Sequence, residues 1–316
     1  MATNTFENAA IKLFRHQYTH NNLYANYCKQ LGKKMEDIGH ITDIPFLPIS
    51  FFRTQPVLAG DQRDVEVVFE SSGTTNTETS KHYVLNTDIY RASLIEGFQH
   101  FYGDIQDYTI IALLPGYLER NNASLIYMAK VLMEESKKQL NGFYLEDFEK
   151  LHKTLTILES KSEKAILLGV TFALLDFAVQ FPISLKSTIV METGGMKGRK
   201  KEMTRNEVHN TLCKQFGLDK IHAEYGMTEL LSQAYSGGNG KFLCTPTMQV
   251  LVRDVNDPFD IKTHGPGCIN IIDVANVNSC PFIATDDIGI IHTDGSFEIL
   301  GRIDNSILRG CNLMVV

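Results

Sequence analysis

Serine and threonine hydroxyls are concentrated in the segment SSGTTNTETSKH, residues 71–82, which follows the apolar run VEVVF. Such a segment offers backbone N–H groups, hydroxyls and a lysine, which together can hold phosphate oxygens. It is not a GxxxxGK[ST] P-loop, because Glu78 stands where the second glycine is required. From this segment alone, a triphosphate-binding loop and a polar surface loop are equally open. The candidate phosphate-binding residues are Ser71, Ser72, Gly73, Thr74, Thr75 and Lys81.

Two later segments resemble motifs that accompany such a loop in the adenylate-forming ligases. EYGMTE at 224–229 is similar to the YGxTE motif of that superfamily, and GRIDNSILRG at 301–310 is similar to GRxDxxIKxxG. ATDD at 284–287 resembles the ribose-binding TGD, and METGGMKG at 191–198 resembles the glycine-rich turn at the adenine edge. Each motif alone is weak, but their number and common order make the resemblance specific over roughly residues 65–316.

The end of the chain narrows the resemblance to one family. Most adenylate-forming ligases continue beyond the hinge motif into a mobile C-terminal domain, whereas this sequence ends in RGCNLMVV directly after it. In this respect it resembles the LuxE-like acyl-protein synthetases. The resemblance implies ATP and Mg²⁺ as cofactors and a carboxylic acid, such as a fatty acid, as substrate. It also implies an acyl-accepting reductase or carrier protein as partner.

The resemblance also implies roles for individual residues. Tyr225 and Gly226 would lie against the adenine, Thr228 would contact a phosphate, and Glu229 would bind the magnesium ion. A hard cation that bridges phosphates takes one or two carboxylates from the protein, which agrees with Glu229; a carboxylate at the start of a helix is the structural alternative. Further nucleotide contacts are implied for Gly194, Gly195, Asp287 and Arg302.

Three positions depart from the family pattern. Asn76 occupies the place of a glycine, Lys81 comes two residues late, and Asp286 replaces the glycine beside Asp287. Among the histidines, only His222 is expected near the site, and the others are interpreted as surface or packing residues.

Cys311 is the expected acyl acceptor. Thioester formation needs an accessible thiolate supported by positive charge, and Cys311 lies close to Arg309 near the end of the chain. A cysteine that is merely tolerated near a terminus is the alternative. The other cysteines show no CxxC spacing and are expected to be reduced core residues; they are Cys28, Cys213, Cys244, Cys268 and Cys280.

Composition restricts the class of protein. The chain has 316 residues, of which 43% are hydrophobic and 21% charged, a globular balance. A net charge of −7 disfavours nucleic acid and anionic membranes as partners, because both require a basic surface. No signal peptide pattern is present, and no apolar run approaches the roughly 18 residues that span a bilayer. We therefore expect a cytoplasmic protein without a membrane span.

Strand-like and helix-like stretches alternate through the middle of the chain. The expected strands are 65–69, 109–114, 165–169, 187–192 and 219–225. The expected helices are 5–31, 122–140, 171–180 and 203–216, and the Asn pair 121–122 is suited to cap the second of them. This alternation predicts α/β layers around a mainly parallel sheet. From residue 240 onward, short glycine-punctuated β runs predict a small antiparallel sheet or barrel.

Together these features predict an α/β adenylation-domain fold with layered, mainly parallel sheets, a small β-rich subdomain and no mobile C-terminal domain. The expected adenylate-forming domain is 1–300, with a body at 1–235, a β-rich part at 236–300, and the hinge motif and tail at 301–316. The predicted function is activation of a carboxylic acid as acyl-adenylate, followed by transfer to Cys311. Two alternatives stay open: an adenylating ligase that delivers to coenzyme A or a carrier protein, and a nucleotide-binding module without turnover.

Overall fold

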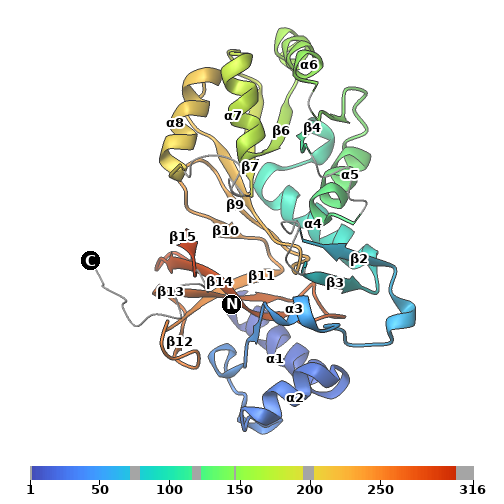
Figure 1. Cartoon of the computed structure of the whole chain (residues 1–316), viewed down its shortest axis with the longest axis vertical. Helices are drawn as coiled ribbons and strands as arrows, with labels where there is room; N and C mark the ends of the chain where they lie inside the picture. Colours follow the sequence, from blue (N-terminus) through green and yellow to red (C-terminus); the bar gives the residue numbers. More distant parts are fainter. Residues whose placement is uncertain (1, 72–78, 116–121, 146, 195–202, 304–316) are drawn as a thin grey trace.

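A computed structural model describes residues 2–71, 79–115, 122–145, 147–194 and 203–303. Figure 1 shows two stacked regions: a larger one built from the middle of the chain, and a smaller one that contains both the first helix and the last strand of the described chain. The candidate site residues described below come from both regions.

The larger region is built on a seven-stranded sheet. Its strands, in spatial order, are β10 (Leu243–Cys244), β9 (Ala234–Ser236), β8 (His222–Tyr225), β7 (Thr188–Thr193), β6 (Ala165–Val170), β4 (Thr109–Leu113) and β5 (Gly142–Phe143). The five strands from β8 to β5 are parallel, and β9 and β10 are antiparallel. Every residue of β4 and β6 is buried, as expected for apolar strands covered on both faces.

Five helices flank this sheet. They are α4 (Thr87–Tyr102), α5 (Ser124–Ser136), α6 (Phe148–Ser160), α7 (Thr171–Gln180) and α8 (Arg205–Phe216). In Figure 1, α7 and α8 lie together on one side of the strands, and α4 and α5 lie together on the other. The alternation of strand and helix predicted this layered arrangement.

The smaller region is a mainly antiparallel sheet. It contains β1 (Leu47–Pro48), β14 (Phe282–Ile291), β13 (Gly265–Asp273), β11 (Met248–Arg253) and β12 (Ile261–Lys262), while β15 (Phe297–Arg302) also pairs with β14. Only β1 joins its neighbour in parallel. The helices α1 (Ala2–His20), α2 (Asn22–Gln30) and α3 (Phe51–Thr54) belong to this region. The ring of Phe282 on β14 packs against Phe14 of α1 and Tyr24 of α2.

A two-stranded hairpin lies next to both sheets. Its strands are β2 (Val67–Glu70) and β3 (Lys81–Val84), paired antiparallel. Short 3₁₀ turns occupy Met35–Asp37, Ile41–Asp43, Gln62–Asp64 and Ile105–Asp107.

The predicted fold class and the main elements are confirmed. A mainly parallel sheet with flanking helices is present, and the β-rich run from β11 onward forms the antiparallel sheet, to which β1 is added. Two details were wrong. The helix expected at 5–31 is divided at Asn21, whose side chain accepts a hydrogen bond from the Tyr24 N–H and caps α2. The N-cap of α5 is Ala123 rather than an Asn of the pair, and the Asn122 carbonyl instead accepts from the Glu70 N–H.

The buried apolar side chains form two clusters. One lies around the seven-stranded sheet and its helices, and the other lies between the second sheet and the N-terminal helices. Apolar side chains between Ala10 and Val57 thus pack in the second cluster. The expected subdomain boundary at residue 235 stays a prediction. Among the described helices, none combines the length and apolar character needed to cross a membrane.

Candidate active site

The carboxyl ends of β7 and β8 lie side by side at one edge of the parallel sheet, where open α/β sheets bind ligands. β7 runs into Gly194, whose φ of +69° is a conformation that favours glycine. The Gly194 carbonyl accepts a hydrogen bond from the Thr171 hydroxyl at 2.9 Å. The turn expected at the adenine edge therefore begins at the edge of the sheet; Gly195 lies outside the described residues.

Tyr225, at the end of β8, joins the two regions. Its ring packs against Phe297 and Phe242, with centroids 5.4 and 5.9 Å away, and its hydroxyl donates to Asp287 Oδ2 at 2.8 Å. Burial raises the pKa of Tyr225, so the phenol stays protonated and remains a donor. Gly226 follows as an exposed residue, and a Cβ there would come within 2.4 Å of Glu224 Oε1.

Asp287 also forms an ion pair with Arg302. The two residues are direct partners across β14 and β15, and Arg302 Nε donates to Asp287 Oδ1 at 2.8 Å. One buried carboxylate thus connects two motifs that lie 77 residues apart, at 225 and 302. Because side chains alternate along a strand, the extra carboxylate of Asp286 belongs to the opposite face of β14 from Asp287.

Glu229 and Thr228 follow directly along the chain. Glu229 is buried, and this burial raises the pKa of its carboxyl; the Ser80 side chain and the positive charges of Arg302 and Arg53 act in the opposite direction. In the part of the chain that the structure describes, the Glu229 carboxylate forms no ion pair within 4.0 Å. A buried hard oxygen ligand is compatible with Mg²⁺, which takes few protein ligands and keeps waters and phosphates.

His82, on β3, was not assigned to the site from the sequence, yet it binds the YGMTE segment. Its Nδ1 lies 2.8 Å from the Thr228 carbonyl, and its Nε2 lies 3.0 Å from Asn276 Oδ1. Asn276 Nδ2 donates in turn to the Glu229 carbonyl at 2.9 Å. His222, the histidine expected near the site, instead meets the Tyr102 hydroxyl at 3.2 Å. A histidine beginning a strand after a hydroxyl-rich loop is a weak signal, which is why sequence reasoning missed His82.

The hydroxyl-rich loop is closed at its base. The Ser71 N–H donates to the Ser80 carbonyl at 3.0 Å, and the Ser80 N–H donates to the Ser71 hydroxyl at 2.9 Å. Lys81 follows as an exposed residue at the start of β3. The other candidate phosphate contacts lie outside the described residues; they are Ser72, Gly73, Thr74 and Thr75.

The cysteines of the described chain are all free. Burial raises the pKa of every one of them, to about 12 for Cys28 and Cys244. The remaining three with a raised pKa are Cys213, Cys268 and Cys280. Cys311 lies outside the described residues, so its role stays a prediction.

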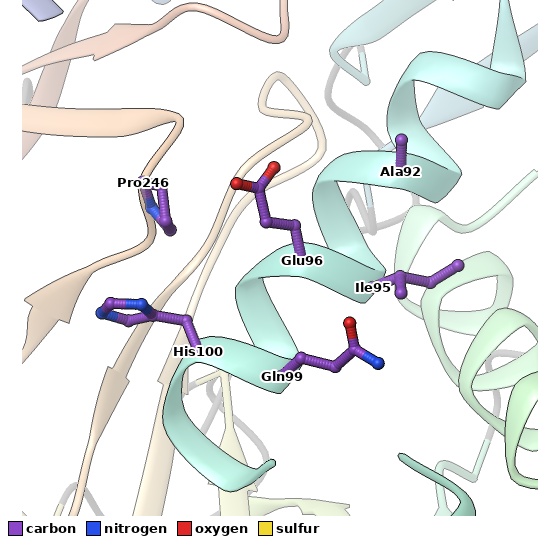
Figure 2. A pocket seen from close by; sticks show the side chains of 6 residues that line it. All are labelled: Ala92, Ile95, Glu96, Gln99, His100 and Pro246. Atoms are coloured by element: carbon purple, nitrogen blue, oxygen red, sulfur yellow. The ribbon is translucent and has the colours of Figure 1, made fainter. Parts of the chain in front are cut away.

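A separate hollow lies on the surface of α4. Figure 2 shows Glu96 and His100 on the side of this helix that faces Pro246. Its lining residues are Ala92, Ile95, Glu96, Gln99, His100 and Pro246. None of the residues assigned from the motifs lines it. Within the described ranges, no three His, Cys, Asp or Glu side chains converge into a metal site.

Comparison with protein families identifies the chain. The family model described as "Acyl-protein synthetase, LuxE" matches residues 2–316. The chain belongs to the LuxE acyl-protein synthetase family. It is therefore a ligase of the AMP-forming type, as the order of the motifs predicted.

Curated relatives support the assignment to this family. The chain is 24% identical over 327 residues to a long-chain-fatty-acid–luciferin-component ligase of Vibrio harveyi, covering 95% of this chain and 84% of the relative. It is 23% identical to the ligase of the same name from Aliivibrio fischeri, covering 95% and 85%. Among solved structures, a 2-hydroxyisobutyryl-CoA ligase in complex with 2-HIB-AMP superposes with a TM-score of 0.70 at 10% identity, covering 95% of this chain and 68% of that one. This likeness shows that the chain shares the fold of an adenylate-forming ligase.

Proposed function

We propose that this protein activates a fatty acid with ATP to an acyl-adenylate, and then transfers the acyl group to the thiol of Cys311 for delivery to a partner reductase. One observation carries the nucleotide part of the proposal: Asp287 joins Tyr225 and Arg302, so that motifs from two regions of the fold meet at one buried carboxylate. The family match supports the class of reaction. The names of the curated relatives support a long-chain fatty acid as substrate, and the family description supports a protein acceptor.

In the first half-reaction, a carboxylate oxygen of the acid attacks the α-phosphorus of ATP. The bond from the α-phosphorus to the oxygen that bridges it to the β-phosphorus breaks, and pyrophosphate leaves. Catalysis of such a displacement consists mainly of alignment and of neutralising phosphate charge. Ser71, Lys81 and Thr228 would hold the triphosphate, together with the loop residues Ser72, Gly73, Thr74 and Thr75.

Asp287 and Arg302 would hold the nucleotide at the α-phosphate and ribose. Each Asp287 oxygen accepts one protein hydrogen bond, and each has a second lone pair that can accept from a ribose hydroxyl. Tyr225, Gly226, Gly194 and Gly195 would lie around the adenine. The hinge motif thus contributes directly to nucleotide binding.

Glu229 would supply the protein ligand for Mg²⁺. When bound, the ion neutralises negative charge on the phosphates as pyrophosphate leaves. The raised pKa of Glu229 fits a carboxylate that is costly to leave buried without a cation. Glu229 would bind the ion as the ionised carboxylate.

In the second half-reaction, the Cys311 thiolate attacks the carbonyl carbon of the acyl-adenylate. The carbon–oxygen bond to the phosphate breaks, AMP leaves with the electron pair, and a thioester forms. A thiolate is needed for this attack. The raised pKa values of the described cysteines favour Cys311 as the acceptor.

The proposal is tested by measuring ATP–pyrophosphate exchange with a panel of short, medium and long straight-chain acids. We expect exchange that depends on the acid and on magnesium, and that is strongest with long-chain acids. Parallel reactions with and without coenzyme A show whether a soluble thiol is the acceptor. A chain that binds ATP but supports no exchange with any acid would identify a nucleotide-binding module instead.

A further inference from the structure

His82 and Asn276 form a buried pair that holds the backbone of the YGMTE segment, and we name this pair the carbonyl clamp. His82 is fully buried and Asn276 is 1% exposed. One member contacts the Thr228 carbonyl and the other contacts the Glu229 carbonyl, at 2.8 and 2.9 Å. Two consecutive carbonyls are therefore held by two side chains that also contact each other at 3.0 Å.

The proton positions follow from chemistry. A backbone carbonyl can only accept, so Nδ1 of His82 carries the proton that is donated to Thr228. Asn276 Nδ2 faces two carbonyls, those of Glu229 and Cys280 at 2.9 and 3.2 Å, which fixes the orientation of its amide. This orientation turns Asn276 Oδ1 toward Nε2 of His82, so the 3.0 Å contact between them is a hydrogen bond only when the ring carries a second proton. The clamp therefore has a defined direction: both of its members donate toward the backbone of the 228–229 segment.

The clamp joins three segments that carry separate motifs. His82 is two residues from Ser80, so the two side chains point to the same face of the chain at the base of the hydroxyl-rich loop. The Ser80 side chain acts to lower the pKa of the Glu229 carboxyl, while His82 contacts the Thr228 backbone. Asn276 lies in the connection between β13 and β14, and β14 carries Asp287. A shift in any of these segments would move the other two.

We infer that His82 and Asn276 are positioning residues, which place Thr228 and the Glu229 carboxylate for binding of magnesium and triphosphate. This inference rests on the roles proposed above for Thr228 and Glu229. Neither clamp residue contacts substrate in this account; both act through the backbone of the segment they hold. Edge-to-face packing of Phe52 on the His82 ring, with centroids 5.8 Å apart, further restricts the position of the imidazole.

Substitutions at His82 separate the two contacts of its ring. The amide nitrogen of an asparagine can replace Nδ1 and keep the bond to Thr228, whereas the longer glutamine side chain reaches toward the position of Nε2. We therefore expect His82→Asn to keep most of the function and His82→Gln to lose it. Asn276→Ala removes the donor to the Glu229 carbonyl. Asn141→Ala is the matched control, because Asn141 also donates to a backbone carbonyl, that of Met133 at 2.8 Å, but holds no site residue.

The primary measurement is the affinity for ATP by calorimetry, with magnesium and with EDTA. Wild type should gain affinity when magnesium is present, and this gain should be lost in His82→Gln and Asn276→Ala but kept in His82→Asn and Asn141→Ala. The exchange rate should fall about 10- to 100-fold in the first two variants, the range expected for misplacement of a catalytic group. Thermal unfolding of all four variants measures their stability separately.

Two results would overturn the positioning role of the carbonyl clamp while leaving the proposed function intact. One is that His82→Gln and Asn276→Ala show the same magnesium effect on ATP affinity, and the same exchange rate, as wild type. The other is an equal loss in Asn141→Ala, which would assign the effect to stability alone. A wild-type chain that binds ATP with no help from magnesium would instead overturn both the metal role of Glu229 and the inference built on it.

Discussion

Arg302 donates from Nε to Asp287 Oδ1 at 2.8 Å, although 68% of the arginine side chain is exposed and only 6% of the aspartate side chain is. The aspartate is therefore fixed within the fold, while the guanidinium stays largely hydrated. Because the guanidinium is exposed, Arg302 can turn toward a phosphate while the Tyr225 hydroxyl still donates to the aspartate. The pair combines a rigid acceptor with a cation that is free to follow the ligand.

Arg302→Gln should raise the KM for ATP. Loss of a charge-assisted hydrogen bond to the nucleotide corresponds to an increase of about 10- to 100-fold. Steady-state kinetics of pyrophosphate release against ATP concentration measures this change. Arg63→Gln is the control, since Arg63 forms an exposed pair with Asp61 outside the site. Equal KM values for the two variants would remove Arg302 from the nucleotide site.

Glu229→Gln should lose magnesium-supported adenylation while it remains folded, because the change removes charge and keeps shape. We expect a loss of about 10²-fold or more, as for removal of one preorganised electrostatic group. The measurement is ATP–pyrophosphate exchange as a function of magnesium concentration. Glu159→Gln provides the comparison, because the Glu159 carboxylate accepts backbone hydrogen bonds from Lys186 and Ser187 away from the site. Near-normal exchange in the Glu229 variant would end its assignment to the metal.

Cys311→Ser should separate the two half-reactions. The variant should still release pyrophosphate but retain no thioester, because a hydroxyl has a much higher pKa than a thiol and is a poor acceptor at neutral pH. Labelled acid is incubated with ATP and magnesium, and protein-bound label that neutral hydroxylamine releases is counted after denaturation. Cys213→Ser, a matched change at a cysteine whose pKa burial raises, should retain the label. Wild type that adenylates but carries no such label would point to a soluble acceptor.

Glu224 should make the stability of the protein depend on pH. Burial raises the pKa of its carboxyl to about 7, against an ordinary value of 4.5. The folded state therefore binds a proton more tightly than the unfolded state, so stability falls as the pH rises from 4.5 toward 7 and levels off above that. Glu224→Gln keeps an acceptor for the Thr193 hydroxyl and removes this titration.

The measurement is the free energy of unfolding in urea, for both proteins, from pH 5 to pH 8, a range of about three units that contains the raised pKa. The variant should gain stability relative to wild type as the pH rises, by up to about 3 kcal/mol. Other titrating groups are the same in both proteins and cancel in the difference. Parallel curves would show that Glu224 ionises in the folded protein as easily as in the unfolded chain.

Local sequence patterns were sufficient to predict much of the fold of this protein. The apolar runs at 109–114 and 165–169 form the buried strands β4 and β6, because a strand covered on both faces needs apolar residues throughout. The order of the motifs predicted the adenylate-forming fold, since each motif is a short, contiguous set of residues that the sequence displays directly. The LuxE-like family expected from the sequence is confirmed by the family match.

Tertiary structure alone decided which side chains meet. His82 contacts a carbonyl 146 residues away and an asparagine 194 residues away, and Tyr225 donates to a carboxylate 62 residues away. No local periodicity encodes such bonds, because they depend on how the hairpin, the parallel sheet and the antiparallel sheet pack together. The same reason explains why His222 was expected at the site: closeness along the chain suggested it, but its side chain lies beside Tyr102. The sequence by itself thus determined the class of chemistry and the strands that carry it, and the packing of the two sheets determined which buried groups hold the site in place.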